Sequence, residues 1–284
     1  MPVHLDVQSR RTFNFRLVIM TDRYAVFGNP ISHSKSPRIH AEFARQTGQD
    51  LVYQAIEAPL DGFHAAALSF RDTGGRGANV TVPFKEQAHA LATLRSDRAD
   101  AAGAVNTLIF DGNEIVGDNT DGAGLVNDLV GNLGFDPAER RILLLGAGGA
   151  ARGVGLPLME RGPAELFVAN RTAYKARELS ARFDCHGGGY DALPGRQFDL
   201  VINATAASLA GDLPPLPDDI LAPGALAYDM MYGRDTPFLA FARARGARVA
   251  DGLGMLVEQA AEAFFVWRGV RPATAPVIAM LKAS

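Results

Sequence analysis

The most informative stretch of the chain reads Arg141-Ile-Leu-Leu-Leu-Gly146-Ala-Gly148-Gly149-Ala150-Ala151. Its apolar run shows no alternation, which is typical of a strand covered on both faces by helices. The following residues match the pattern G-x-G-x-x-G/A, in which the first glycine makes a tight turn and the second lets the backbone approach a pyrophosphate. The next helix offers free N–H groups and a positive dipole end to the phosphates. We predict a dinucleotide site at Gly146, Ala147, Gly148, Gly149 and Ala150; the alternative is a glycine-rich turn in an unrelated α/β protein.

The second strand of this unit ends in Ala169-Asn170-Arg171-Thr172. An NAD site usually carries an acid here to bond the ribose 2′-hydroxyl, and none is present. Arg171 instead offers a guanidinium that can grip a 2′-phosphate by a bidentate pair, with Lys175 close behind. The pattern therefore predicts NADP as the cofactor. A helix cap followed by surface bases is the competing interpretation, but it does not explain the missing acid.

Strand-like and helix-like segments alternate on both sides of this unit, which indicates an α/β chain of doubly wound type. Turn signals separate the segments, among them the hairpin dipeptide Asp111-Gly112. A change of pattern places a domain boundary near residues 120–135. The predicted strands are 24–27, 51–55, 77–82, 104–110, 114–117, 141–145, 165–169, 198–203 and 225–230. The predicted helices are 36–47, 60–70, one beginning at Pro83, 121–133, 150–161, 172–183, 237–246, 254–267 and 276–282.

Composition excludes several classes of protein. The 284 residues include 28 Lys and Arg against 31 Asp and Glu, and no long basic block stands out, so a nucleic-acid partner is not expected. No apolar run reaches the ~18 residues of a membrane-spanning helix. The single cysteine, Cys185, cannot form an intrachain disulfide and fits a reducing, cytoplasmic compartment. The six histidines show no metal-ligand spacing, so no metal is expected, and residues 1–19 are expected to form a poorly ordered leader.

Two strand-to-helix junctions carry candidate catalytic groups. In Asn79-Val-Thr81-Val-Pro83-Phe-Lys85 the lysine falls in the first turn of a helix, where the helix dipole destabilises its charged form and favours proton transfer. A surface lysine pointing to solvent is the alternative. In Asp118-Asn-Thr-Asp121-Gly two acids lie where ligands of open α/β sheets bind, although an ordinary helix N-cap also explains them. An aspartate beside the lysine would hold it and tune its protonation.

A third junction, Ser32-His33-Ser34-Lys35-Ser36-Pro37, is rich in hydroxyl groups. We predict Ser36 as the helix N-cap and Pro37 as the first helical residue. Capping needs only one hydroxyl, so the others suit an anionic or polyhydroxylated ligand. His33 is expected to be structural or solvent-facing rather than catalytic.

Together these motifs resemble those of the shikimate dehydrogenase family, over about residues 22–282. Each segment is weak evidence alone, but the set in this order is highly specific. The segments are Gly28-Asn-Pro-Ile-Ser-His-Ser-Lys-Ser-Pro37, Asn79-Val-Thr-Val-Pro-Phe-Lys85, Ala104-Val-Asn-Thr107, Asp118-Asn-Thr-Asp-Gly122, Gly146-Ala-Gly-Gly-Ala150, Asn170-Arg-Thr172, Tyr228-Asp-Met-Met-Tyr232 and Gly252-Leu-Gly-Met-Leu-Val-Glu-Gln259.

The resemblance implies an N-terminal α/β substrate domain (20–122), a Rossmann-type dinucleotide-binding domain (123–254) and C-terminal helices (255–284) that return to the first domain. It implies reversible NADPH-dependent reduction of 3-dehydroshikimate to shikimate, a step toward chorismate and the aromatic amino acids. Lys85 and Asp121 are implied as the catalytic pair. The implied substrate contacts are Ser34, Ser36, Asn79, Thr81, Asn106, Tyr232 and Gln259. The implied cofactor contacts are Gly146, Ala147, Gly148, Gly149, Ala150, Asn170, Arg171, Thr172, Lys175, Met230, Gly252 and Met255.

Two departures from the family pattern bear on the cofactor. Lys175 stands where the family usually has an arginine, which keeps the charge but loses the bidentate fork. Ala206-Ala207 stand where the family more often has small polar residues or glycine. The margin of NADP over NAD therefore stays open.

Rival interpretations remain. A quinate/shikimate dehydrogenase with relaxed NAD(P) use is the nearest, although Thr81 and the Asn170-Arg-Thr172 loop favour the strict form. A non-catalytic NADP-binding sensor would keep the glycine loop but has no reason to retain Lys85 and Asp121. The expected partner is a small-molecule substrate, and the chain is expected to be a monomer or a homodimer.

Overall fold

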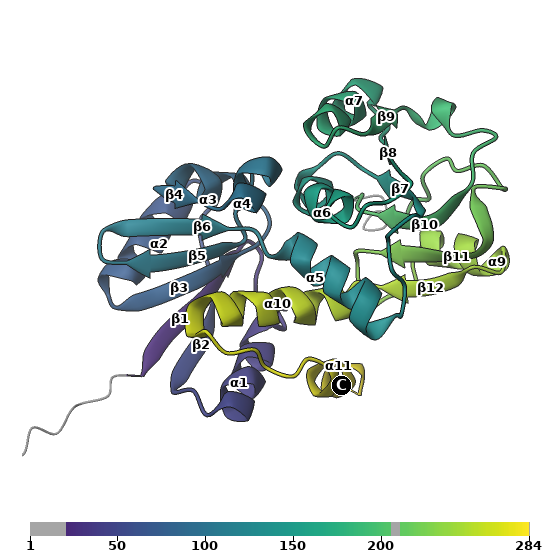
Figure 1. Ribbon diagram of the computed structural model, residues 1–284. Coiled ribbons are helices and arrows are strands. Elements are labelled where there is room, and N and C mark those ends of the chain that lie inside the picture. Colours follow the sequence, from purple (N-terminus) through teal and green to yellow (C-terminus); the bar gives the residue numbers. More distant parts are fainter. Residues whose placement is uncertain (1–20, 206–210, 284) are drawn as a thin grey trace, which may run out of the picture.

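The computed structural model describes residues 21–205 and 211–283. It contains two six-stranded sheets, which lie side by side with helices packed on them (Figure 1). The predicted leader 1–19 and the Ala206-Ala207 departure lie outside the described residues. Within the described ranges, no helix has the length and apolar character needed to cross a membrane.

The first sheet is mixed and has the order β2-β1-β3-β5-β6-β4. Strands β1, β2 and β3 pair in parallel, whereas β5 runs antiparallel to both β3 and β6. The strands are β1 (Asp22–Gly28), β2 (Leu51–Glu57), β3 (Gly75–Val80), β4 (Leu94–Arg95), β5 (Thr107–Asp111) and β6 (Glu114–Asp118). The accompanying helices are α1 (Ser36–Thr47), α2 (Phe63–Asp72), α3 (Lys85–Leu91) and α4 (Asp97–Ala102).

The second sheet is parallel throughout and has the order β9-β8-β7-β10-β11-β12. This is the 3-2-1-4-5-6 order of Rossmann folds, so the predicted fold class is confirmed. Its strands are β7 (Arg141–Leu145), β8 (Glu165–Ala169), β9 (His186–Gly188), β10 (Phe198–Asn203), β11 (Leu221–Asp229) and β12 (Arg248–Asp251). The helices are α6 (Gly149–Met159), α7 (Ala173–Arg182), α9 (Pro237–Ala244) and the short 3₁₀ turn η2 (Tyr190–Ala192).

The burial of strand β7 explains why its sequence lacks alternation of apolar and polar residues. Ile142 and Leu144 are fully buried in an apolar cluster on one face of the sheet, and Leu143 and Leu145 are fully buried in a cluster on the other. Both faces are covered, as the run of apolar residues predicts. The strand order reverses between β7 and β10, and ligands of such sheets bind at this position.

Two helices connect the sheets and pack on each other, α5 (Asp121–Asn127) and α10 (Leu253–Arg268), with α11 (Ala275–Lys282) completing the chain (Figure 1). The contact is close because Gly124 has no side chain: a Cβ there would stand 2.6 Å from the Cβ of Gln259. Helix α5 continues as a π-helical turn, η1 (Asp128–Asn132). The buried Asp128 in that turn accepts a hydrogen bond of 2.6 Å from the hydroxyl of Tyr228 on β11.

Several predicted elements need correction. Ser36 is the first helical residue and Lys35 is the N-cap, so the predicted serine cap is wrong. The helix predicted from residue 60 begins at Phe63, because Pro59 to Gly62 form a turn closed by the hydrogen bond from Gly62 N to Pro59 O. The strand predicted from 225 begins at Leu221. Strands β4, β9 and β12 and helix α4 were not predicted.

Candidate active site

A cleft of about 1320 Å³ lies between the two sheets. Its walls come from the carboxyl ends of β1 and β3, from the loop after β7 and from the start of α10. Of the predicted site residues, Thr172 and Lys175 do not line this cleft, and all the others do. The cleft therefore brings the candidate catalytic, substrate and dinucleotide residues to one place.

Lys85 and Asp121 form an ion pair in this cleft. The Lys85 Nζ donates to Asp121 Oδ2 at 2.6 Å, although the two residues are 36 positions apart in sequence. Lys85 is the first residue of α3 and Asp121 is the first residue of α5, so two helix N-termini converge here. The side chains are 22% and 9% exposed, which lets both reach the cleft while most of their surface is covered.

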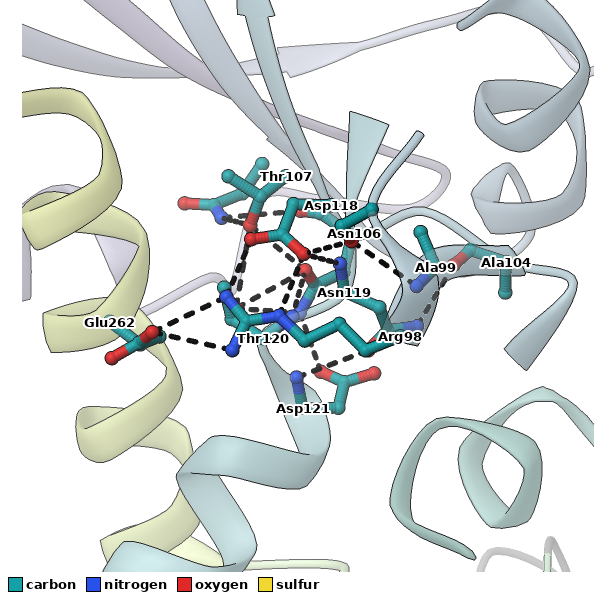
Figure 2. A network of polar contacts seen from close by, with 12 residues as sticks. Arg98, Ala99, Ala104, Asn106, Thr107, Asp118, Asn119, Thr120, Asp121 and Glu262 are labelled. Atoms are coloured by element: carbon teal, nitrogen blue, oxygen red, sulfur yellow. Dashed lines mark hydrogen bonds and ion pairs between the residues drawn. The ribbon is translucent and has the colours of Figure 1, made fainter. Parts of the chain in front are cut away.

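Asn106 holds the second oxygen of Asp121. Its Nδ2 donates to Asp121 Oδ1 at 2.7 Å and to Thr120 Oγ1 at 3.0 Å, and its Oδ1 accepts from the backbone N–H of Thr120 at 2.9 Å (Figure 2). Because one carboxylate oxygen faces Lys85 and the other faces Asn106, the plane of the Asp121 carboxylate is fixed. An aspartate held in this way can orient the ammonium and a ligand hydroxyl together.

A second ion network supports this turn from behind. Arg98 on α4 contacts Asp118 at 2.5 Å and Glu262 on α10 at 3.3 Å (Figure 2). Burial alone would raise the pKa of Asp118, but hydrogen bonds from Arg98 and Ser96 bring that pKa below its ordinary value. Asp118 therefore stays ionised, and α4, the end of β6 and α10 are tied together beside the catalytic turn.

Asn79 lines the cleft, but its side-chain amide is already hydrogen-bonded within the protein. Its Oδ1 accepts from the Tyr53 hydroxyl at 2.7 Å, and its Nδ2 donates to Asn106 O at 3.2 Å and to Thr107 Oγ1 at 3.1 Å. Both amide hydrogens are thus used within the protein. The ring of Tyr53 stacks on buried His40, with centroids 4.1 Å apart and planes at 6°. Asn79 therefore supports Asn106 more directly than it offers donors to a ligand.

The glycine loop after β7 has the geometry of a phosphate cradle. Gly146 has φ +110°, and a Cβ there would stand 3.0 Å from Ala204 O, so only glycine fits without strain. Gly148 and Gly149 face open space, because a Cβ at either position would meet no atom within 4 Å. Helix α6 starts at Gly149, so its first N–H groups have no partner within the helix. These features fit a dinucleotide pyrophosphate, which needs close backbone approach and N–H donors.

The loop after β8 forms the end of the dinucleotide site that would bind adenosine. Arg171 is exposed, lines the cleft and has no ion-pair partner among residues 21–205 and 211–283. Asn170 Nδ2 donates to Thr172 O at 3.1 Å, which stiffens the loop. An unpaired guanidinium in place of an acid fits the 2′-phosphate of NADP.

Sequence reasoning missed several cleft residues. Tyr190, Asn203, Thr205 and Leu213 all line it. Asn203 is the last residue of β10 and Thr205 lies two residues beyond it, on the far side of the switch point from Gly146, and that position was the available signal. Tyr190 follows β9, a strand that the sequence pattern did not reveal.

A Rossmann sheet with a phosphate cradle, facing a Lys–Asp ion pair across one cleft, defines a dinucleotide-dependent dehydrogenase. Family models agree with this class. The model for "Shikimate dehydrogenase substrate binding domain" matches residues 26–108, "Shikimate / quinate 5-dehydrogenase" matches residues 129–210, and "Shikimate 5'-dehydrogenase C-terminal domain" matches residues 252–282.

Individual relatives cover almost the whole chain. The shikimate dehydrogenase (NADP(+)) of Nitrosospira multiformis is 62% identical over 271 residues, which are 93% of this chain and 98% of that protein. The crystal structure of an Ael1 enzyme from Pseudomonas putida has a TM-score of 0.89 and 54% identity, covering 92% and 98% of the two chains. That of Thermus thermophilus shikimate 5-dehydrogenase, in complex with NADP(H) and shikimate, has a TM-score of 0.82 and 35% identity, covering 91% and 97%. The chain belongs to the shikimate dehydrogenase family.

Proposed function

We propose that the chain catalyses the reversible NADPH-dependent reduction of 3-dehydroshikimate to shikimate, a step toward chorismate and the aromatic amino acids. The observation that carries the proposal is the Lys85–Asp121 ion pair in the same cleft as the Gly146 cradle. A cofactor-binding module without chemistry would need the cradle alone.

The chemistry divides between cofactor and protein. NADPH supplies the hydride when it is bound. The Lys85 ammonium polarises the carbonyl oxygen of the substrate and gives that oxygen the proton that the product hydroxyl requires. Asp121 holds Lys85 through Oδ2 and is placed by Asn106, so the ammonium is directed into the cleft. In the oxidation direction the same lysine takes the proton back.

Substrate recognition is assigned to the polar wall formed by the first sheet. Ser34 and Ser36 hold the carboxylate; the backbone N–H of Ser36 already donates to Ser34 Oγ at 3.3 Å, which leaves the Ser34 hydroxyl hydrogen for a ligand. Asp121 takes the ring hydroxyls together with Asn106, which would exchange one of its hydrogen bonds to Asp121 Oδ1 or Thr120 Oγ1 for a bond to the substrate. The remaining contacts are Asn79, through its support of Asn106, and Thr81, Tyr232 and Gln259.

The cofactor lies along the second sheet in this proposal. Residues Gly146 to Ala150 hold the pyrophosphate, and Met230, Gly252 and Met255 lie beside the nicotinamide. Asn170, Arg171, Thr172 and Lys175 surround the adenosine phosphate, and of these Asn170 and Arg171 line the cleft. The domains follow the sheets: 20–122 with 255–284 bind substrate, and 123–254 bind NADP. We propose a cytoplasmic enzyme that acts as a monomer or a homodimer.

The test follows NADPH absorbance with purified protein, shikimate and either NADP or NAD, with quinate as a parallel substrate. Reduction of NADP by shikimate alone supports the proposal. Comparable rates with quinate or NAD would move the protein to the quinate/shikimate dehydrogenases of broader specificity. Absence of turnover with every pair, from protein that still binds NADPH, would refute the roles of Lys85 and Asp121. Lys85→Ala separates enzyme from sensor, because an enzyme loses turnover while it keeps NADPH binding.

A further inference from the structure

Tyr190 lies beside Arg171 at the adenosine end of the cleft. Strands β8 and β9 run parallel, with Ala169 opposite Gly188. The backbone N–H of Asn170 continues this pairing by donating to Gly188 O at 3.1 Å. Two residues beyond the last paired position the chain reaches Arg171 after β8 and Tyr190 after β9. Both residues line the cleft.

The charges around Tyr190 and Arg171 favour an anionic ligand. Arg171 is exposed and has no ion-pair partner in the part of the chain that the structure describes. Lys175, in the first turn of α7, is exposed but does not line the cleft. Of the nearby acids, Asp191 does not line the cleft, and Asp212 lines it from the loop beyond β10. The guanidinium at this end is therefore open to a phosphate.

Tyr190 is built to act as a fixed donor. It is half-buried, and its ring packs against the apolar cluster that includes Leu193 and Phe198. Burial raises the pKa of its hydroxyl, and the positive charge of Arg171 opposes that rise. The phenol stays protonated at neutral pH, so it can donate a hydrogen bond. A donor anchored by its ring costs little entropy when a ligand arrives.

We infer that the Tyr190 hydroxyl donates to the 2′-phosphate of NADP together with Arg171, and so helps to distinguish NADP from NAD. The inference rests on the proposed function, which makes NADP the cofactor. It also accounts for the lysine at position 175. Lysine cannot offer the bidentate fork of an arginine and here lies outside the cleft, so a second donor beside Arg171 takes its place.

The experiment is calorimetric titration of Tyr190→Phe with NADP, NAD, adenosine 2′,5′-bisphosphate and 5′-AMP, none of which requires turnover. Phenylalanine keeps the packed ring and removes only the hydroxyl. Because a hydrogen bond to a charged group is lost, the Kd for NADP and for the bisphosphate should rise about tenfold. The Kd for NAD and 5′-AMP should not change. Tyr174→Phe is the matched control, since Tyr174 is 60% exposed on α7 and does not line the cleft.

Two results would overturn the inference. If Tyr190→Phe weakens the binding of all four ligands equally, the residue supports the adenosine and does not recognise the 2′-phosphate. If it weakens none, the hydroxyl makes no contact with the phosphate. Wild-type protein is assayed for shikimate oxidation in parallel. Failure of that assay, or of NADP binding by the wild type, would count against the proposed function itself, whereas an unchanged Tyr190→Phe titration beside an active wild type counts only against Tyr190.

Discussion

The stability of this protein should fall in mild acid because of one histidine. His40 on α1 is 1% exposed, and neither ring nitrogen has a hydrogen-bond partner among the described residues. It lies among the rings of Phe43, Tyr53, Phe264 and Trp267. Burial lowers the pKa of His40 from 6.5 to about 3. The folded protein therefore keeps this ring neutral, whereas the unfolded chain protonates it below pH 6.5.

The magnitude follows from this difference in pKa. Above pH 6.5 neither state protonates the ring, and the full stability is present. Between pH 6.5 and about 3 only the unfolded state binds the proton, so the free energy of unfolding falls by about 1.4 kcal/mol for each pH unit. At about pH 5 the loss from this residue is about 2 kcal/mol. That is a large part of the stability of an ordinary domain.

Urea denaturation of wild type, His40→Phe and His40→Gln at a series of pH values measures this loss. Phenylalanine keeps a ring against Tyr53, and glutamine keeps a polar group, so the two variants bracket any change in packing. The free energy of unfolding of wild type minus that of each variant should be constant above pH 6.5 and should decline by about 1.4 kcal/mol per unit below it. Parallel curves for wild type and both variants would refute the reasoning, because they would mean that His40 binds its proton equally in both states.

Three other changes have defined outcomes. Lys85→Met should lower kcat for shikimate by roughly 10²–10⁴-fold while NADPH binding, measured by fluorescence titration, is kept; an unchanged kcat would exclude the lysine from proton transfer. Gly146→Ala places a side chain at φ +110° and 3.0 Å from Ala204 O, which costs about 1–3 kcal/mol and should weaken NADPH binding in the same titration. Arg98→Met leaves Asp118 buried without its cation, which should cost about 1–3 kcal/mol in urea denaturation; a smaller loss would mean that water replaces the guanidinium.

The second sheet could be predicted well because its central strands are apolar on both faces. Strands β7, β8 and β10 have the predicted bounds. The outer strands could not be predicted. Strand β9 is the tripeptide His186-Gly187-Gly188, which carries no apolar pattern, and it exists because its backbone pairs with β8. Strand β12 is short and only half-buried, and it depends in the same way on β11.

The candidate site was only partly predictable for a related reason. Lys85 and Asp121 can each be recognised as candidates from the local sequence, since both lie at a strand-to-helix junction. What holds them depends on contacts between distant segments. The Arg98–Glu262 contact joins residues 164 positions apart. The Tyr53 hydroxyl that occupies Asn79 comes from a strand 26 positions away. No local spacing encodes such partners, so the supporting groups emerge only from the folded chain.

These supports show which parts of the site are fixed relative to each other. The turn that carries Asp121 is tied to α4 and α10 by Arg98, and α5, which starts at Asp121, packs closely on α10 through Gly124. Helix α10 in turn begins beside Met230, where the proposed nicotinamide site lies. The Lys–Asp pair and that end of the cofactor site therefore share one support. Opposite them, Arg152 on α6 pairs with the exposed Glu86 beside Lys85, a contact with little cost to break. The glycine loop is nevertheless held close to the catalytic turn by packing, because α6 contacts α4 and α5 and a Cβ at Gly122 would stand only 2.6 Å from Gly153 O.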